Sequence, residues 1–242
     1  VSQNATILKL VMSEESSVLK LPHYFSVRKE TFLGDIFFVV QIVAAVWFGF
    51  AQVGTLLVSV EGASITWMGL WFAFVIMNFS LAIGASRKGT DRVIKQAVAN
   101  YFAWTLVIGL AFFTLLIQGA SWNSIDSYTS IITGIGILGL IVYARTSGLE
   151  IFDPIIRGGF ALLFKFVPQM TLAVNVWLYG GSGIAQYTIW VGHFIISMRI
   201  GQIWISAYKT NWDRHRIGVV IGELGNEVSW IVVTIVWLMV LE

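Results

Sequence analysis

The chain alternates long apolar runs with short polar breaks. A hydrocarbon core of about 30 Å takes roughly 20 helical residues at about 1.5 Å each. Strands of a membrane barrel would be about 10 residues long and would alternate polar and apolar positions, which these runs do not. The pattern therefore predicts an all-α membrane protein with seven transmembrane helices, at residues 33–60, 65–86, 96–119, 127–145, 155–180, 184–208 and 217–241.

Three of the breaks have the composition of tight turns. They are residues 61–64 (EGAS), 119–124 (GASWNS) and 180–183 (GGSG), which are rich in the glycine and serine typical of turns.

Composition supports a lipid environment. Hydrophobic residues make up 57% of the chain and charged residues 12%, whereas a soluble domain carries about 25% charged residues. The net charge of +2 and the absence of a basic tract give no indication of nucleic-acid binding. The lipid bilayer is the predicted surrounding partner, and we expect the first helix to act as its own insertion signal.

The basic residues indicate an orientation. Every Lys and Arg except Lys165 and Arg199 lies before the first span or in, or within three residues of, the 2–3, 4–5 and 6–7 connections. Cytoplasmic loops collect Lys and Arg because these residues are translocated poorly. The N-terminus is therefore predicted to be cytoplasmic and the C-terminus outside.

Catalytic and metal-binding patterns are absent from the sequence. There is no cysteine, and His193 has no second His at a ligand spacing, so no metal site is predicted. No nucleophile, phosphate-loop or cofactor motif occurs, so neither an enzyme nor a cofactor is expected. The GxxxG pattern of Gly218 and Gly222 indicates helix packing, within the chain or between subunits.

A faint internal repeat relates the first and last three spans. Three landmarks recur in order: FGFAQ (48–52) with FKFVPQ (164–169), Asp91-Arg92 with Asp213-Arg214, and Asn100/Trp104 with Asn226/Trp230. They predict a 3+1+3 plan with a cytoplasmic arm at 1–32, a triplet at 33–119, a linker helix at 127–145 and a triplet at 155–241. An odd linker leaves both triplets in the same orientation, an arrangement that transporters use.

These landmarks resemble the PQ-loop superfamily, which includes the SWEET sugar transporters. The resemblance implies that Pro168 is a hinge and that Asn and Trp residues of the third helices line a central solute pocket. The matching positions are Pro168, Gln169, Asn100 and Asn226. The first triplet has Ala51-Gln52 in place of Pro-Gln, and the predicted N-in orientation is closer to the PnuC-type vitamin-precursor transporters.

Charged residues inside the predicted spans are candidates for function, because charge is unfavourable in a bilayer. Lys165, Arg199, Glu223 and Glu227 lie at depths of roughly 10–16 Å, at about 1.5 Å per residue. They predict a cluster that binds solute or relays a proton. The alternative is an ion-pair network that only fastens helices together.

The predicted solute-binding residues are Asn100, Asn226, Gln52, Gln169, Trp104 and Trp230. Each has a structural alternative: the glutamines could bond free backbone carbonyls, the tryptophans could face lipid or an interface, and Pro168 could form a static kink. Trp71, Trp190 and Trp204 were further candidates for stacking on a flat ring.

Together these features predict a transporter or facilitator that moves a small polar solute by alternating access between two three-helix halves. The alternatives are a non-transporting subunit of a membrane complex and a seven-helix receptor or light sensor. The last predicted span holds no lysine for a retinal Schiff base. A homo-oligomer or a partner in a membrane complex is compatible with the sequence.

Overall fold

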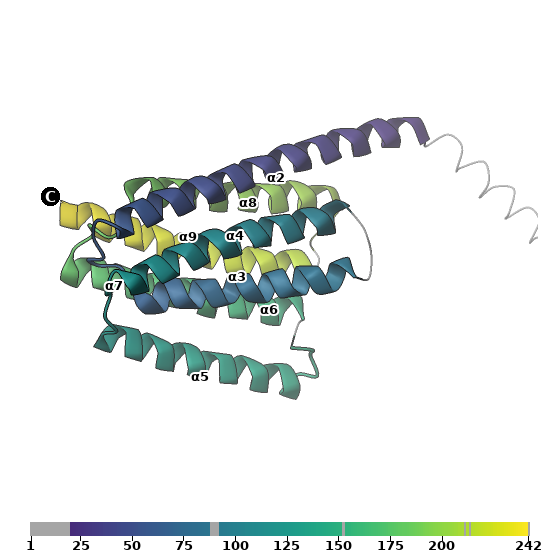
Figure 1. The fold of residues 1–242 in the computed structure, drawn as a ribbon. Coiled ribbons are helices and arrows are strands. Elements are labelled where there is room, and N and C mark those ends of the chain that lie inside the picture. The colour runs from purple at the N-terminus through teal and green to yellow at the C-terminus, as the bar shows by residue number, and fades with distance from the viewer. Residues whose placement is uncertain (1–19, 88–91, 152, 211, 213, 242) are drawn as a thin grey trace, which may run out of the picture. The chain divides into compact units, whose positions relative to one another are not determined.

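The computed structural model describes residues 20–87, 92–151, 153–210, 212 and 214–241, and within these ranges the secondary structure is helical without strands. Figure 1 shows the arrangement. The helices are α2 (Lys20–Leu56), α3 (Ile65–Ser86), α4 (Arg92–Ile117), α5 (Ser124–Thr146), α6 (Pro154–Ala161), the π-helical turn η1 (Leu162–Phe166), α7 (Val167–Tyr179), α8 (Gln186–Thr210) and α9 (Arg214–Leu241).

The chain divides into two compact units, residues 1–40 and residues 41–242. The first contributes the described part of α2 up to Val40, so α2 begins well before the first predicted span. Residues 1–19 of the predicted N-terminal arm lie outside the described residues. The rest of this section concerns the second unit.

Six described helical segments are long and apolar enough to cross a bilayer: Gly34–Leu56, Ile65–Gly84, Lys95–Ile117, Ser124–Thr146, Pro154–Tyr179 and Ile217–Val240. The protein is therefore an integral membrane protein. Helix α8 occupies the sixth predicted span but is not among the six. It carries His193, Arg199 and Gln202, which lower its apolar character.

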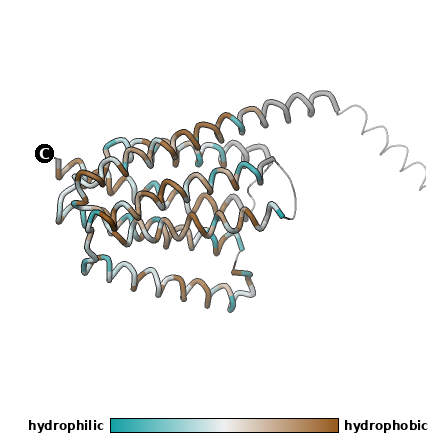
Figure 2. Tube along the Cα trace, in the orientation of Figure 1, coloured by the Kyte–Doolittle hydropathy of each residue, from teal (hydrophilic) through white to brown (hydrophobic). Residues whose placement is uncertain are grey.

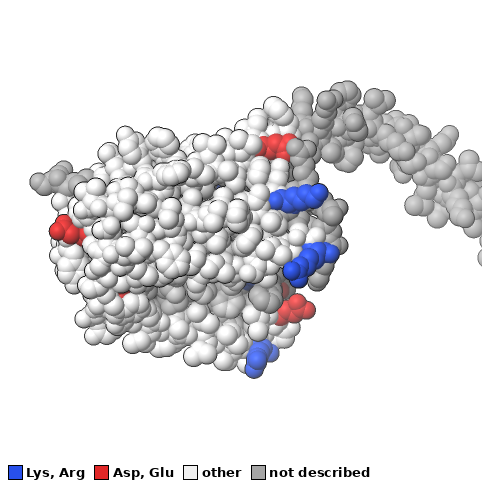
Figure 3. Space-filling view, in the orientation of Figure 1, with Lys and Arg blue, Asp and Glu red and all other residues white. Residues whose placement is uncertain are grey.

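Much of the trace is apolar, as Figure 2 shows by residue hydropathy, and many of the large apolar side chains are exposed. On α5, for example, Ile131, Ile135 and Leu138 are 58%, 66% and 64% exposed. An apolar surface of this kind is unfavourable in water and suits contact with lipid tails. Lys and Arg side chains gather at one end of the face in Figure 3. Arg87 after α3, Lys95 in the first turn of α4 and Arg145 in the last turn of α5 are exposed.

In the C-terminal part of the fold, α9 packs between α6–α7 on one side and α8 on the other. The contact with α6 is close because glycines meet across it. A Cβ atom on Gly218 would lie 2.0 Å from the carbonyl oxygen of Pro154, and one on Gly158 would lie 2.5 Å from that of Gly218. The GxxxG pattern therefore packs helices within this chain.

In the N-terminal part, α4 packs along α3 and also approaches α2. A Cβ atom on Gly49 would lie 2.5 Å from Cβ of Val107, so the two backbones come close at this glycine. Helix α4 thus lies between α2 and α3. Helix α5 packs on the α6–α7 segment and on α3.

The segment from α6 to α7 is interrupted one residue before Pro168. The N–H of Val167 donates to the carbonyl of Leu162, five residues back, which closes the π turn η1. Proline has no N–H and its ring clashes with the carbonyl four residues earlier, so an ordinary α-helix cannot run through it undisturbed. The wider turn accommodates Pro168 where the sequence predicted a kink.

The start of α5 is fixed by a buried carboxylate. Asp126 forms a capping box with Asn123, and its Oδ1 accepts hydrogen bonds from Ser64 Oγ (2.7 Å) and the N–H of Thr66 (3.0 Å). The carboxylate therefore ties α5 to the start of α3. An Asn followed three residues later by Asp is the sequence signal for this cap.

Candidate functional site

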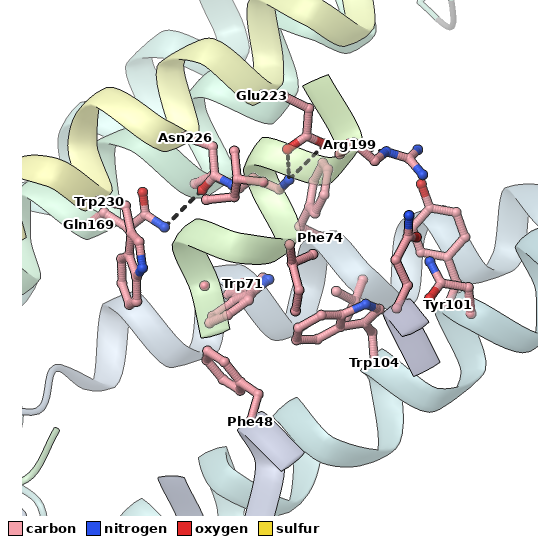
Figure 4. Close-up of a pocket in the computed structure, with 17 residues that line it drawn as sticks. Phe48, Trp71, Phe74, Tyr101, Trp104, Gln169, Arg199, Glu223, Asn226 and Trp230 are labelled. Carbon is pink, nitrogen blue, oxygen red and sulfur yellow. Dashed lines mark hydrogen bonds and ion pairs between the residues drawn. The ribbon is translucent and has the colours of Figure 1, made fainter. Parts of the chain in front are cut away.

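A cavity of about 110 Å³ lies among α2, α3, α4, η1, α7, α8 and α9. Since one ordered water needs roughly 10–15 Å³ on this measure, the cavity has room for several waters or one small solute. Figure 4 shows its lining. The lining residues are Gln41, Phe48, Trp71, Phe74, Val75, Asn100, Tyr101, Trp104, Lys165, Gln169, Gly192, Ile195, Ile196, Arg199, Glu223, Asn226 and Trp230.

Two Asn–Trp pairs face this cavity from different helices. Asn100 and Trp104 lie one turn apart on α4, and Asn226 and Trp230 lie one turn apart on α9. Residues four apart share a helix face, which explains why both members of each pair line the same space. The four residues predicted from the repeat therefore meet at one cavity.

The two asparagines differ in their hydrogen bonds. Asn226 Oδ1 accepts a hydrogen bond of 2.8 Å from Gln169 Nε2, and Gln169 Oε1 accepts one from the hydroxyl of Ser229. Asn100 Oδ1 is buried and has no hydrogen-bond partner among the described residues. A buried acceptor without a donor is unfavourable, so this atom suits a donor from water or from a bound molecule.

Aromatic rings form one wall of the cavity. The centroids of Phe48 and Trp71 are 5.2 Å apart, those of Phe48 and Trp104 5.5 Å, and those of Trp71 and Trp104 5.8 Å. Trp230 stacks on Trp67 at 6.2 Å, and its indole N–H donates to the carbonyl of Ile189. Such rings offer flat apolar faces to a ligand.

A charged group occupies the opposite wall. Lys165 Nζ lies 3.4 Å from both carboxylate oxygens of Glu223, and Arg199 Nε lies 3.7 Å from one of them. The ring of Tyr101 stands beside the Arg199 guanidinium in Figure 4. Lys165 lies 5.1 Å over the ring of Phe74. Three of the four predicted charges are therefore neighbours in the cavity.

Glu227 does not join this group. Its Oε1 lies 2.6 Å from His193 Nδ1, and His193 Nε2 lies 2.8 Å from the hydroxyl of Thr234. Glu227 is one turn further along α9 than Glu223, so its carboxylate meets α8 at a different level. The predicted four-charge cluster is thus two separate groups, and Glu227 is not a lining residue.

The structure also places Gln52 away from the cavity. Its Nε2 donates to the carbonyl of Gly183 at 2.8 Å and its Oε1 accepts from the N–H of Ala185 at 3.3 Å. Both amide groups are therefore used by the α7–α8 loop. The sequence prediction of Gln52 as a solute ligand disagrees with this placement, because the residues of α2 that line the cavity are Gln41 and Phe48.

The same loop contacts the α2–α3 loop at one end of the molecule. The Oγ atoms of Ser59 and Ser182 are 2.7 Å apart, and Ser182 Oγ donates to a carboxylate oxygen of Glu61. The backbones meet as well: a Cβ atom on Gly62, whose φ is 74°, would lie 1.7 Å from the carbonyl oxygen of Gly180. This end lies opposite the one that carries the exposed Lys and Arg residues.

The other predicted stacking residues divide between cavity and surface. Trp71 lines the cavity, whereas Trp190 and Trp204 are exposed. Gln41 and Tyr101 also line it, and the sequence reading did not single them out. Tyr101 could have been found from its position beside Asn100. Gln41 could have been found as a polar residue inside an apolar span.

Comparisons with protein-family models, with curated proteins and with solved structures find no match to this chain.

Proposed function

We propose that this protein is a membrane transporter or facilitator for a small polar solute, and that the cavity is its binding site. The observation that carries the proposal is the pair of Asn–Trp sets on α4 and α9, which face one cavity from separate helices. Amides supply hydrogen bonds and indoles supply flat apolar surfaces, a combination that suits a polar solute with a ring or carbon skeleton.

The contacts between helices favour two related halves. Helix α4 lies between α2 and α3, as α9 lies between α6–α7 and α8. Gln41 on α2 donates to Gln202 on α8 at 3.1 Å, and α3 packs on η1 and α7. If α2 corresponds to α6–α7 and α3 corresponds to α8, the contact between α2 and α8 is equivalent to the contact between α3 and the α6–α7 segment. This is the relation expected of parallel three-helix repeats joined by a linker, here α5.

The two halves also suggest how access would alternate. The loops after α2 and α7 hold the two halves together at one end through Ser59, Glu61, Ser182 and Gly183. A movement at η1 beside Pro168 would shift Lys165 and Gln169, because both residues lie within one helical turn of Pro168. We assign Pro168 the role of hinge, and Lys165, Arg199 and Glu223 that of a charge relay, from which Glu227 is separated by its pairing with His193.

The proposal includes a seventh span and an orientation. Helix α8 has 25 residues, enough to cross a bilayer, and its polar side chains His193, Arg199 and Gln202 contact other helices of the chain. Because the chain has no cysteine, single cysteines can test the topology. A cysteine at Gln118 should react with an impermeant thiol reagent from outside, and one at Ser147 only after the membrane is opened.

The experiment for transport is uptake into proteoliposomes, with solutes first chosen by their effect on the unfolding temperature. Asn226→Ala should weaken binding or flux roughly tenfold, the equivalent of about 1.4 kcal/mol. Gln118→Ala, which removes an exposed amide at the end of α4, is the matched control and should change neither. Equal flux in the two variants, both folded, would sink the proposal.

A further inference from the structure

The lining of the cavity contains more positive than negative charge. Lys165 and Arg199 contribute two cations, whereas Glu223 is the one carboxylate among the described lining residues. Glu227 does not compensate, because it lies outside the lining and pairs with His193. With Lys, Arg and carboxylate ionised, the described lining carries one unmatched positive charge.

This charge is partly shielded from water. The side chains of Lys165 and Glu223 are each 14% exposed and that of Arg199 is 35% exposed. An unmatched charge in such a place is unfavourable, and a bound counter-charge relieves it. A neutral solute would leave the excess unchanged, a monoanion would cancel it, and a dianion would reverse it.

We infer that the solute is a small monocarboxylate that also carries a hydroxyl donor, with its carboxylate beside Arg199 and Lys165 and its hydroxyl at Asn100 Oδ1. The inference rests on the proposed function and adds the class of solute to it. Arg199 suits a carboxylate because its planar guanidinium presents several N–H donors.

The unpartnered atom of Asn100 supplies the second half of the argument. Its buried Oδ1 can only accept a hydrogen bond, so it selects a donor group on the solute rather than a second carboxylate. The rings of Phe48, Trp71 and Trp104 then cover the carbon skeleton. Sugar acids and small hydroxy acids combine these features, and their sizes run from a few heavy atoms to about a dozen.

The test is a set of solutes that share one ring and differ in charge. Glucuronate, glucose, glucosamine and glucose 6-phosphate are compared by titration calorimetry with the purified full-length protein, with glycerate and lactate as smaller monocarboxylates. Sodium chloride at equal ionic strength controls for a general effect of anions. We expect a monocarboxylate to bind at least about tenfold more tightly than its neutral counterpart.

Variants then locate the charge. Arg199→Gln should remove the preference for the acid. Lys165→Gln should reduce this preference, and it serves as an independent variant in case Arg199→Gln does not fold. Glu223→Gln removes the competing carboxylate and should keep or strengthen it. Glycerate and lactate both carry a hydroxyl next to the carboxylate, so Asn100→Ala should weaken the binding of both.

The outcomes separate this inference from the proposed function. Tighter binding of glucose, glucosamine or the phosphate than of every acid, or no binding of any acid, overturns the inference and leaves transport of another solute open. Binding of an acid that depends on Arg199, without any flux in proteoliposomes, supports the inference and overturns the proposed function.

Discussion

A disulfide between positions 59 and 182 should stop transport, since it would join the two halves at the end where the loops after α2 and α7 meet. The Oγ atoms of Ser59 and Ser182 are 2.7 Å apart, and a disulfide needs about 2.05 Å between sulfurs. The variant Ser59→Cys/Ser182→Cys therefore needs a local approach of well under about 1 Å. No other cysteine competes, because the chain contains none.

The size of the effect follows from the bonds at this end. Ser182 makes two side-chain hydrogen bonds across it, to Ser59 and to Glu61. At about 0.5 kcal/mol each for such exposed bonds, Ser182→Ala would shift the balance toward opening by about 1 kcal/mol, or roughly fivefold. The disulfide acts differently, because it removes the open state from every molecule that it links.

The assay is uptake into proteoliposomes before and after mild oxidation, with the linked fraction read from mobility on a gel. Flux should fall in proportion to the linked fraction and return after reduction. The single variant Ser182→Cys controls for oxidation itself. Undiminished flux through fully cross-linked protein would refute the idea that this end must open.

Three further substitutions test packing, capping and the hinge. Gly218→Ala should lower stability by about 1–3 kcal/mol in a denaturant titration, because its Cβ would meet the carbonyl of Pro154, while Gly134→Ala, with open space around it, should not. Asp126→Asn should lower stability by about 1–3 kcal/mol, since an amide cannot accept all the hydrogen bonds that the buried carboxylate receives. Pro168→Ala should raise the unfolding temperature and lower flux if the proline is a hinge, and equal flux would leave it a static feature.

The period and length of the apolar runs predicted most helices closely. The expected span at 127–145 is α5 (Ser124–Thr146), and that at 217–241 is α9 (Arg214–Leu241). Span length follows from bilayer thickness, so it can be read from sequence. The start of α2 at Lys20 could not be read from span length, because a polar helical extension is not bounded by the bilayer. Pro22 in the first turn of α2 is the local sequence signal for that start.

Side-chain partners were harder to predict than helices. Glu223 and Glu227 share a face of α9, and sequence spacing alone gave them a common role. The π turn at Leu162–Phe166 adds a residue to one turn, which rotates the residues before it relative to Gln169 by roughly 100°. The direction of Lys165, and hence its pairing with Glu223, depends on that turn.

The two landmark glutamines show where the halves diverge. Gln169 follows Pro168 and donates to Asn226, whereas Gln52 follows Ala51 and is held by the opposite loop. If the halves are related as proposed, Gln52 is the residue that would have satisfied Asn100, and its engagement elsewhere leaves Asn100 Oδ1 without a hydrogen-bond partner among the described residues. A departure from the repeat, rather than the repeat itself, thus creates the free acceptor to which a solute can donate.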